Sequence, residues 1–189
     1  MDVSAYLGHW DRSLLPSNVH VGQGCYLEGA HSFDRFSSKR DPGLIIGSNV
    51  AIYTWTAFNV ESSGFISIGD RSLIVGGLFM CADQIVVGAD VVISYHVTVA
   101  DSDFHPLDVK ERRRDAIANA PGGDLASRPH FESRPVVIED GAWIGIGAMI
   151  LKGVTVGANA RIGPGAVVTR DIPARTTWEG NPARLAEPR

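Results

Sequence analysis

The chain has 189 residues, which is enough for one domain with a substantial core and short for two. A net charge of -4 and an isoelectric point of about 5.8 leave no diffuse basic surface, so neither nucleic acid nor an anionic membrane is expected as a partner. The N-terminus does not show a basic start followed by an apolar run, and no stretch approaches the roughly 20 apolar residues that span a bilayer. Two cysteines are too few for a disulfide framework. We therefore expect a cytoplasmic protein.

Residues 1–16 are the first predicted segment. Apolar side chains recur there at helical spacing, and Pro16 ends the pattern: Val3, Tyr6, Leu7, Trp10 and Leu14. The spacing predicts a short N-terminal helix. Because the end of a stack of strands exposes unpaired edges and core side chains, we expect this helix to cover that end.

Residues 17–173 carry a six-residue repeat and are predicted as one domain, with residues 174–189 as a C-terminal tail. In the second half of the repeat an aliphatic residue recurs at every sixth position: Ile138, Ile144, Ile150, Val156, Ile162 and Val168. Four positions after each of these, the residue is small or aliphatic: Ala142, Ala148, Val154, Ala160, Ala166 and Ile172. Earlier hexads are placed at Ile68, Ile74 and Met80 and, after a one-residue slip, at Val87, Ile93 and Val99, with weaker ones beginning at Val21, Leu27, Ile46 and Ile52.

This period predicts an all-β fold in which short strands and tight corners wind into a parallel β-helix. Both sets of hexad positions are expected to face inward, in coils stacked about 4.8 Å apart by parallel ladder hydrogen bonds. A sandwich or barrel of short strands is the alternative, but it would show period two with turns every 8 to 12 residues or so.

Residues 104–135 fit no hexad and contain several proline and glycine residues, so they are predicted as a long excursion loop from the coil. Within it, Asp108 is expected to cap a short helix over Val109 to Ala120. Four basic residues lie on that helix: Lys110, Arg112, Arg113 and Arg114. They form either a solvated face or a contact for phosphate groups or another anion.

Four phrases in the closing coils resemble the maltose and galactoside O-acetyltransferase branch of the hexapeptide-repeat acetyltransferase family. They are Ile138-Glu-Asp-Gly-Ala-Trp143-Ile-Gly, Gly153-Val-Thr-Val-Gly, Gly165-Ala-Val-Val-Thr-Arg-Asp-Ile-Pro173 and Gly180-Asn-Pro-Ala-Arg-Leu185, and the resemblance covers most of residues 46–185. It implies a left-handed coil, a homotrimer with active sites between subunits, acetyl-CoA as co-substrate with no metal required, and a small-molecule acceptor.

One histidine lies in a motif that matches the family. The sequence Asp103-Phe104-His105-Pro106-Leu107-Asp108 is similar to the family's His-Pro-Leu-Asp motif, in which the histidine is the general base. The resemblance therefore implies that His105 takes the proton of the acceptor hydroxyl. A free imidazole has a pKa near 6.5 and can act as a base at neutral pH. Asp103 and Asp108 are candidates to orient the ring.

The resemblance also implies residues that bind the donor. Gly145 and Ile146 match the turn whose backbone meets the pantetheine arm or thioester of CoA, and Gly163 with Pro164 matches a second contact one coil further on. Thr169 and Arg170 match a Thr-Lys pair near the nucleotide end, where arginine retains the positive charge. The same glycines also suit the geometry of tight corners.

Residues for the acceptor are less clearly marked. Trp143 matches a tryptophan that borders the site in the family. Asp83, Tyr95 and His96 precede His105 on neighbouring coils and are predicted to line the acceptor side. Gly76-Gly77 stands about where sugar acetyltransferases carry an acceptor-binding asparagine, and the longer N-terminal helical segment of those enzymes is also missing, so the acceptor need not be a sugar.

Three other functions remain open. One general base can serve an amine as well as a hydroxyl, so N-acetylation of an amino sugar or another amine is an alternative. A non-catalytic β-helix scaffold is a second. A zinc carbonic anhydrase on the same fold is a third, and it needs three converging histidines. The spacing of the six histidines does not favour it: His9, His20, His31, His96, His105 and His130.

Overall fold

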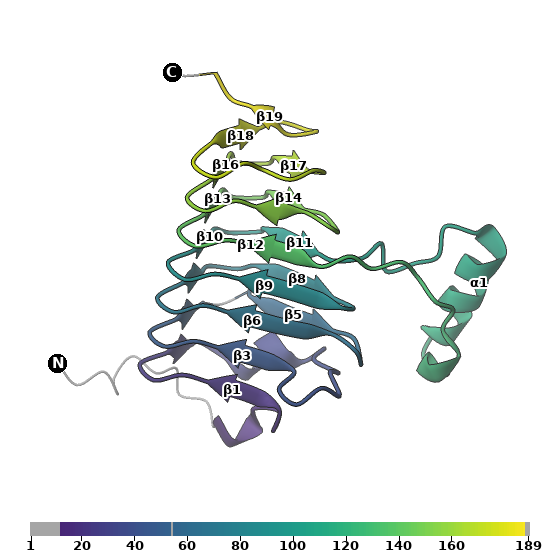
Figure 1. The fold of residues 1–189 in the computed structure, drawn as a ribbon. Helices are drawn as coiled ribbons and strands as arrows, with labels where there is room; N and C mark the ends of the chain where they lie inside the picture. Colours follow the sequence, from purple (N-terminus) through teal and green to yellow (C-terminus); the bar gives the residue numbers. More distant parts are fainter. Residues whose placement is uncertain (1–11, 54, 188–189) are drawn as a thin grey trace.

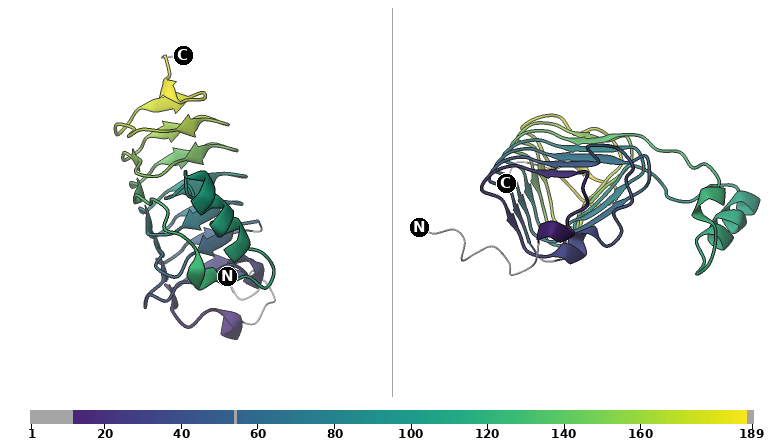
Figure 2. Two further views of the ribbon diagram at one scale, coloured as in Figure 1. Left: turned by 90° about the vertical axis from the view of Figure 1, so that its right-hand side faces the viewer. Right: turned by 90° about the horizontal axis from the view of Figure 1, so that it is seen from below.

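The computed structural model describes residues 12–53 and 55–187. Over these residues, short strands wind into a left-handed parallel β-helix, which confirms the predicted fold class. Figure 1 shows the coils stacked one above another, from β1 at the bottom to β19 at the top. The view along the stack in Figure 2 shows a triangular prism with one arm projecting from it.

The described strands form three sheets, called A, B and C here, which are the faces of the prism. Sheet A contains β1 (Val19–Val21), β3 (Leu44–Ile46), β6 (Phe65–Ile68), β9 (Gln84–Val87), β12 (Val136–Ile138) and β15 (Thr155–Val156). Sheet B contains β2 (Tyr26–Leu27), β4 (Ala51–Ile52), β7 (Leu73–Ile74), β10 (Val92–Ile93), β13 (Trp143–Ile144), β16 (Arg161–Ile162), β18 (Thr177–Glu179) and β19 (Arg184–Leu185). Sheet C contains β5 (Ala57–Val60), β8 (Leu78–Cys81), β11 (Thr98–Ala100), β14 (Met149–Ile150) and β17 (Val167–Val168).

The repeat produces the core because alternate residues of each short strand point inward and adjacent rungs are in register. Ile144 pairs with Ile93 below and Ile162 above, and the side chains of all three are fully buried. Both predicted hexad sets in residues 138–172 are exposed by 2% or less, so their inward orientation is confirmed.

One register prediction in the earlier coils was wrong. Met80 was expected to face the core, but it is half-buried and faces outward, whereas its neighbour Phe79 is fully buried. The aromatic ring of Phe79 stacks on that of Phe58, with centroids 5.2 Å apart. The one-residue slip therefore occurs before residue 80, because strand β8 places an aromatic residue at the inward position.

The corners between the sheets form three edges that run along the prism. Edge A–B includes residues 88–91, edge B–C includes residues 94–97, and edge C–A includes residues 82–83. Edge A–B has a residue with positive φ on successive rungs: Asn49, Arg71, Asp90, Gly141, Asn159 and Arg175. Such corners favour glycine, asparagine and aspartate, so an arginine at two of them is unusual.

The predicted excursion leaves the prism at edge C–A between β11 and β12, and it contains helix α1 (Val109–Ala118) and the 3-10 helix η4 (Leu125–Ser127). Its two ends lie together, because Ser102 pairs with Ser133 and the amide of Arg134 donates to the carbonyl of Asp101 at 2.8 Å. Asp108 caps α1 as predicted by accepting bonds from the amides of Lys110 and Glu111, although the helix ends two residues before Ala120.

The two ends of the chain were predicted as a helix and a tail. Residues 1–11, which carry most of the predicted N-terminal helix, lie outside the described residues. After them the chain forms the 3-10 helices η2 (Arg12–Leu14) and η3 (Ala30–Phe33). At the other end the stack continues past residue 173, because β18 pairs in parallel with β16 and β19 pairs antiparallel with β18. No helix within residues 12–187 has both the length and the apolar character needed to cross a bilayer.

Candidate active site

His105 lies near the start of the excursion, where the chain leaves edge C–A. Its ring nitrogen Nδ1 is 2.6 Å from Oδ2 of Asp115 on helix α1. The His105 side chain is 61% exposed, whereas the Asp115 side chain is fully buried. The ring is therefore held on one side by a buried carboxylate and is open to solvent on the other.

Asp115 stays ionised because several donors surround its carboxylate. Although burial opposes the charge, hydrogen bonds from Arg128 and His105 hold the pKa of Asp115 below its usual value. Arg128 Nε donates to Oδ1 at 2.8 Å, and Nδ2 of Asn119 donates to the same oxygen at 3.1 Å. An ionised Asp115 accepts a hydrogen bond from Nδ1–H of His105, which leaves Nε2 of a neutral ring with a free lone pair.

Arg128 connects this arrangement to the prism. Its Nη1 donates to Oε1 of Glu61 at 2.7 Å, and its Nη2 donates to the carbonyl of Phe104 at 3.1 Å. Glu61 follows strand β5 on edge C–A, 67 residues earlier in the chain. Burial disfavours the charge of Arg128, but bonds to Asp115 and Glu61 outweigh this and raise its pKa. The guanidinium is thus a charged clamp between the excursion and the coil.

The two carboxylates that were candidates to orient His105 have other partners. Asp108 is the N-cap of α1, and Asp103 accepts a hydrogen bond from Nζ of Lys152 at 2.7 Å. Neither candidate contacts the ring in this way, and Asp115 orients it instead. Asp115 follows a run of three arginines on α1, and among the charged residues of that helix it is the buried one.

A cavity of about 460 Å³ lies between the excursion and the lower coils, and His105 forms part of its wall. The prism contributes side chains from β5, β8 and the turn after η3, and the excursion contributes the rest: Asp34, Arg35, Ser37, Asn59, Val60, Glu61 and Met80, with Phe104, His105, Asn119, Leu125 and Arg128. Asn59 and Met80 are paired in register on adjacent rungs of sheet C. The reversed orientation of Met80 thus brings a thioether to this cavity.

Four of the six residues predicted to bind the donor lie at edge B–C: Gly145, Ile146, Gly163 and Pro164. Gly145 and Gly163 are stacked on successive rungs, because the amide of Gly145 donates to the carbonyl of Ile162 and that of Gly165 donates to the carbonyl of Ile146. Ile146 is 47% exposed. Thr169 and Arg170 instead follow β17 on edge C–A, two rungs above the root of the excursion. The predicted donor residues therefore lie on two different edges of one protomer.

The residues predicted to line the acceptor side do not gather around His105. Tyr95 and His96 are exposed on edge B–C, and the ring of His96 stacks on that of Trp55 with centroids 5.8 Å apart. Trp143 projects from sheet B and is 42% exposed. Asp83 lies on edge C–A one rung below the excursion but is absent from the wall of the His105 cavity. Apart from Phe104 and His105, sequence reasoning assigned to the site none of the residues that line this cavity, and it did not name Trp55.

The basic residues on α1 are mostly solvent-facing. Arg112 donates to the carbonyl of Leu107 at 2.8 Å, and Arg114 pairs with Glu111 on the same helix. Among the described residues, which exclude His9, no three His, Cys, Asp or Glu side chains are grouped as metal ligands.

A family model described as bacterial transferase hexapeptide (six repeats) matches residues 135–170. The galactoside O-acetyltransferase of Lactococcus lactis is 35% identical over 102 residues, which cover 54% of this chain and 42% of that protein. A 2,3,4,5-tetrahydropyridine-2,6-dicarboxylate N-acetyltransferase of Staphylococcus aureus is 51% identical over 51 residues, or 27% of this chain and 21% of that protein. The chain spans about half the length of the curated relatives it matches.

Among solved structures, the chain is similar to a hexapeptide-repeat acetyltransferase of Vibrio cholerae in complex with acetyl-CoA. The TM-score is 0.60 with 26% identity, and the match covers 77% of this chain and 70% of the other. The match to this structure therefore covers more of the chain than residues 135–170, which the family model matches.

Proposed function

Because the chain belongs to the hexapeptide-repeat acetyltransferase family, we propose that it transfers an acetyl group from acetyl-CoA to a hydroxyl of a small molecule or sugar. One observation carries this proposal: the imidazole of His105 is bound at Nδ1 by the buried carboxylate of Asp115, and its other side is open. A histidine held in this way is suited to accept a proton from an acceptor in the adjoining cavity.

In the proposed mechanism, Nε2 of His105 takes the proton of the acceptor hydroxyl while the oxygen attacks the thioester carbonyl of acetyl-CoA. The tetrahedral intermediate collapses by breaking the carbon–sulfur bond, and the imidazolium returns the proton to the departing CoA thiolate. The ionised Asp115 stabilises the imidazolium that exists between these steps. The products are the acetyl ester and free CoA, and the enzyme ends in its starting protonation state.

We place the donor against edge B–C, at Gly145 and Ile146 and at Gly163 and Pro164, with the active site between subunits of a homotrimer. Two findings support this arrangement. The acetyl-CoA complex of the Vibrio cholerae protein is a structural relative, and His105 leaves from edge C–A rather than edge B–C. A second copy of the chain can bring its edge B–C to the excursion of the first, so that both halves of the site meet.

His105→Ala tests the base. We expect kcat to fall by about 10² to 10⁴ because the acceptor proton then has no receiver, while binding of CoA is retained. Release of CoA thiol with a panel of alcohols, sugars and amines measures the rate. His20→Ala is the matched control, since His20 is an exposed histidine on β1.

The outcomes of this experiment separate the parts of the proposal. Light scattering should give the mass of three chains for both variants, and another mass would contradict the trimer. Near-normal turnover of His105→Ala would remove this residue from the mechanism. A chain that releases no thiol with any acceptor, although it is folded and trimeric, would favour the scaffold.

An amine acceptor is the second candidate, because 51 residues of this chain are matched at 51% identity by an N-acetyltransferase. An amine needs the same base and the same thioester, so the mechanism above changes only in the attacking atom. Mass spectrometry of the product distinguishes the two: hydroxylamine at alkaline pH cleaves an oxygen ester and leaves an amide intact.

A further inference from the structure

A small cavity of about 430 Å³ lies at edge A–B near the C-terminal end of the prism, away from the excursion. It is lined by Asn159, Arg161, Arg175, Thr176 and Thr177, and none of these residues is acidic. Arg161 and Thr177 are paired on adjacent rungs of β16 and β18, so their side chains leave sheet B one above the other. Arg175 is the corner residue immediately before them, with a φ of 61°.

Neither Arg161 nor Arg175 forms a side-chain hydrogen bond or an ion pair within residues 12–187. Three other arginines of the prism and excursion, for example, form ion pairs. Arg71 pairs with Asp90, Arg128 with Asp115 and Glu61, and Arg134 with Glu132. Both guanidinium groups are exposed and line one cavity, so an anion bound there is attracted by both.

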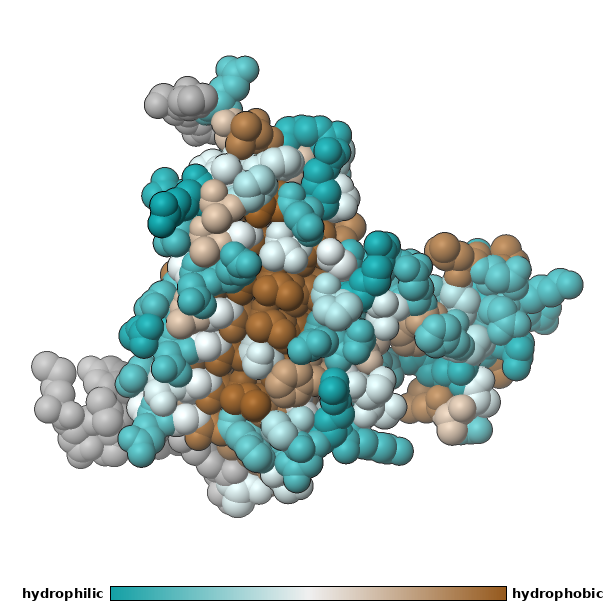
Figure 3. Space-filling view, viewed as in Figure 1, coloured by the Kyte–Doolittle hydropathy of each residue, from teal (hydrophilic) through white to brown (hydrophobic). Residues whose placement is uncertain are grey.

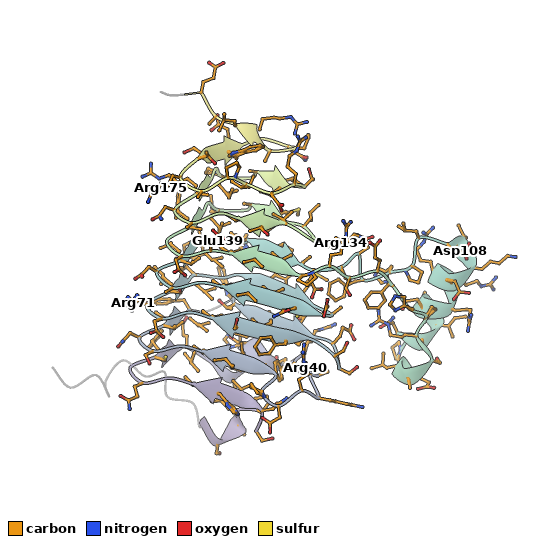
Figure 4. The ribbon with its side chains drawn as sticks, in the orientation of Figure 1. Arg40, Arg71, Asp108, Arg134, Glu139 and Arg175 are labelled. Atoms are coloured by element: carbon orange, nitrogen blue, oxygen red, sulfur yellow. The ribbon has the colours of Figure 1, made fainter. Side chains whose placement is uncertain are left out.

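The same edge contains an internal comparison. Arg71 and Arg175 both occupy the positive-φ corner of their rungs, and Figure 4 shows them projecting from the same side of the prism. On the rung next to Arg71, the corner residue is Asp90, which accepts a bidentate pair of hydrogen bonds at 2.8 and 2.7 Å. On the rung next to Arg175, the corner residue is Asn159, which has no charge. Arg71 is therefore paired with a carboxylate on the neighbouring rung, whereas Arg175 has an uncharged amide there.

We propose that Arg161 and Arg175 bind the phosphate group of a phosphorylated small molecule. A single carboxylate is matched by one guanidinium, as Asp90 is by Arg71, whereas two guanidinium groups suit a dianion with three free oxygens. The exposed hydroxyl of Thr177 and the amide of Asn159 supply further donors. This site goes beyond the acetyl transfer proposed for His105 and does not depend on it.

An adjoining groove suggests where the rest of such a ligand lies. It shares Arg161 and Thr177 with the cavity and extends over Trp143, and at Gly163 and Pro164 it reaches the surface on which the donor is placed above. Glu179 and Glu187 also line it, so the phosphate belongs at the arginines and an uncharged or flat group belongs near the indole of Trp143. The view in Figure 3 shows hydrophilic side chains around this upper left edge of the prism.

Calorimetric titration of the full-length chain at low ionic strength tests the site, with inorganic phosphate, glucose 6-phosphate, adenosine 5′-monophosphate and acetate as separate probes. We expect the phosphates to bind and acetate to bind at least about tenfold more weakly. In the double variant Arg161→Gln/Arg175→Gln, the Kd for phosphate should rise at least about tenfold, since two charge-assisted contacts are lost. Arg71→Gln is the matched control and should leave it unchanged.

Asn159→Asp provides a second variant that keeps both arginines. It places at Arg175 the carboxylate that Asp90 offers to Arg71, and aspartate tolerates this corner conformation. We expect phosphate binding to be lost and the melting temperature to be unchanged or higher. Phosphate binding equal to the native chain in both variants, or acetate binding as tight as phosphate, would overturn the proposal. His105→Ala should bind phosphate normally, so the outcome is independent of acetyl transfer.

Discussion

At the scale of single residues, the decisive pair is an exposed imidazole and a buried carboxylate. The ring of His105 has two nitrogens, and the proposed reaction requires a lone pair on the one that is not bound to Asp115. Asp115 fixes this choice because a carboxylate can only accept at Nδ1, so that nitrogen must carry the proton. The buried acid is in turn kept ionised by Arg128. Asp115 is therefore a positioning residue that acts through His105.

Asp115→Asn should lower kcat by about 10² or more while changing KM little, because an amide can donate to Nδ1 and so favour the inactive tautomer. Steady-state kinetics measures the effect. Nitrogen-detected spectra of the labelled ring provide a readout that a merely structural role would leave unchanged, with Nδ1 expected to lose its proton. A fall in kcat of the expected size together with unchanged ring signals would contradict this role.

The sequence allowed one member of this pair to be predicted but not the other. His105 stands in a contiguous motif, so its role could be inferred from adjacent residues. Asp115 is ten residues away on a helix with no repeat, and its contact depends on how the excursion folds back. Arg128 and Glu61 are 67 residues apart, and no local pattern relates them. Predicting their ion pair requires the path of the whole excursion.

At the scale of elements, helix α1 is fixed by capping at its start and by Asp115 on its buried side. Its end was predicted two residues late: the amide of Asn119 makes the last regular helical bond, to the carbonyl of Asp115, and the amide of Ala120 bonds instead to the carbonyl of Ile117, three residues back. In the coils, the inward pattern was predicted well after residue 138 and misplaced at Phe79 and Met80. There both candidates are large apolar residues, and neither hydrophobicity nor period separates them.

The attachment of α1 should depend on pH through Asp115. Its folded pKa is lowered, so the carboxylate contributes stability above the ordinary aspartate value and this contribution is lost as the pH falls through the folded pKa. Hydrogen exchange of the α1 amides, corrected for the intrinsic pH effect, should show constant protection from pH 8 to about pH 5 and a loss below about pH 4. Protection that declines already between pH 7 and 5 would assign the attachment to another group.

At the scale of the whole molecule, each coil contacts its neighbours through one layer of inward side chains. Unfolding a coil therefore exposes the faces of the coils above and below it, and core substitutions weaken the stack locally. The adjacent residues of β3 provide a test with identical chemistry: Ile46 is 1% exposed, whereas Ile45 is 37% exposed on the outer face.

Ile46→Ala should reduce the free energy of unfolding by about 2 to 5 kcal/mol, because it leaves a cavity in the core. Ile45→Ala should cost about 1 kcal/mol or less. Urea titrations of both variants measure the difference. Equal losses would mean that the outer face of sheet A is buried in the assembled protein, in which case the two substitutions should also differ in their effect on oligomer mass.

The excursion enters and leaves the prism at neighbouring points, with Ser102 and Ser133 paired. The strands on either side of it keep their register with the rung below, because β11 pairs with β8 and β12 pairs with β9. The coil is thus closed across the insertion as if the inserted segment were absent. Its length and composition can change by mutation without shifting the register of a single rung, since the entropy of closing a longer loop grows only slowly. Under the proposed function, the excursion that carries His105 can therefore vary while the coils against which the donor is placed stay constant.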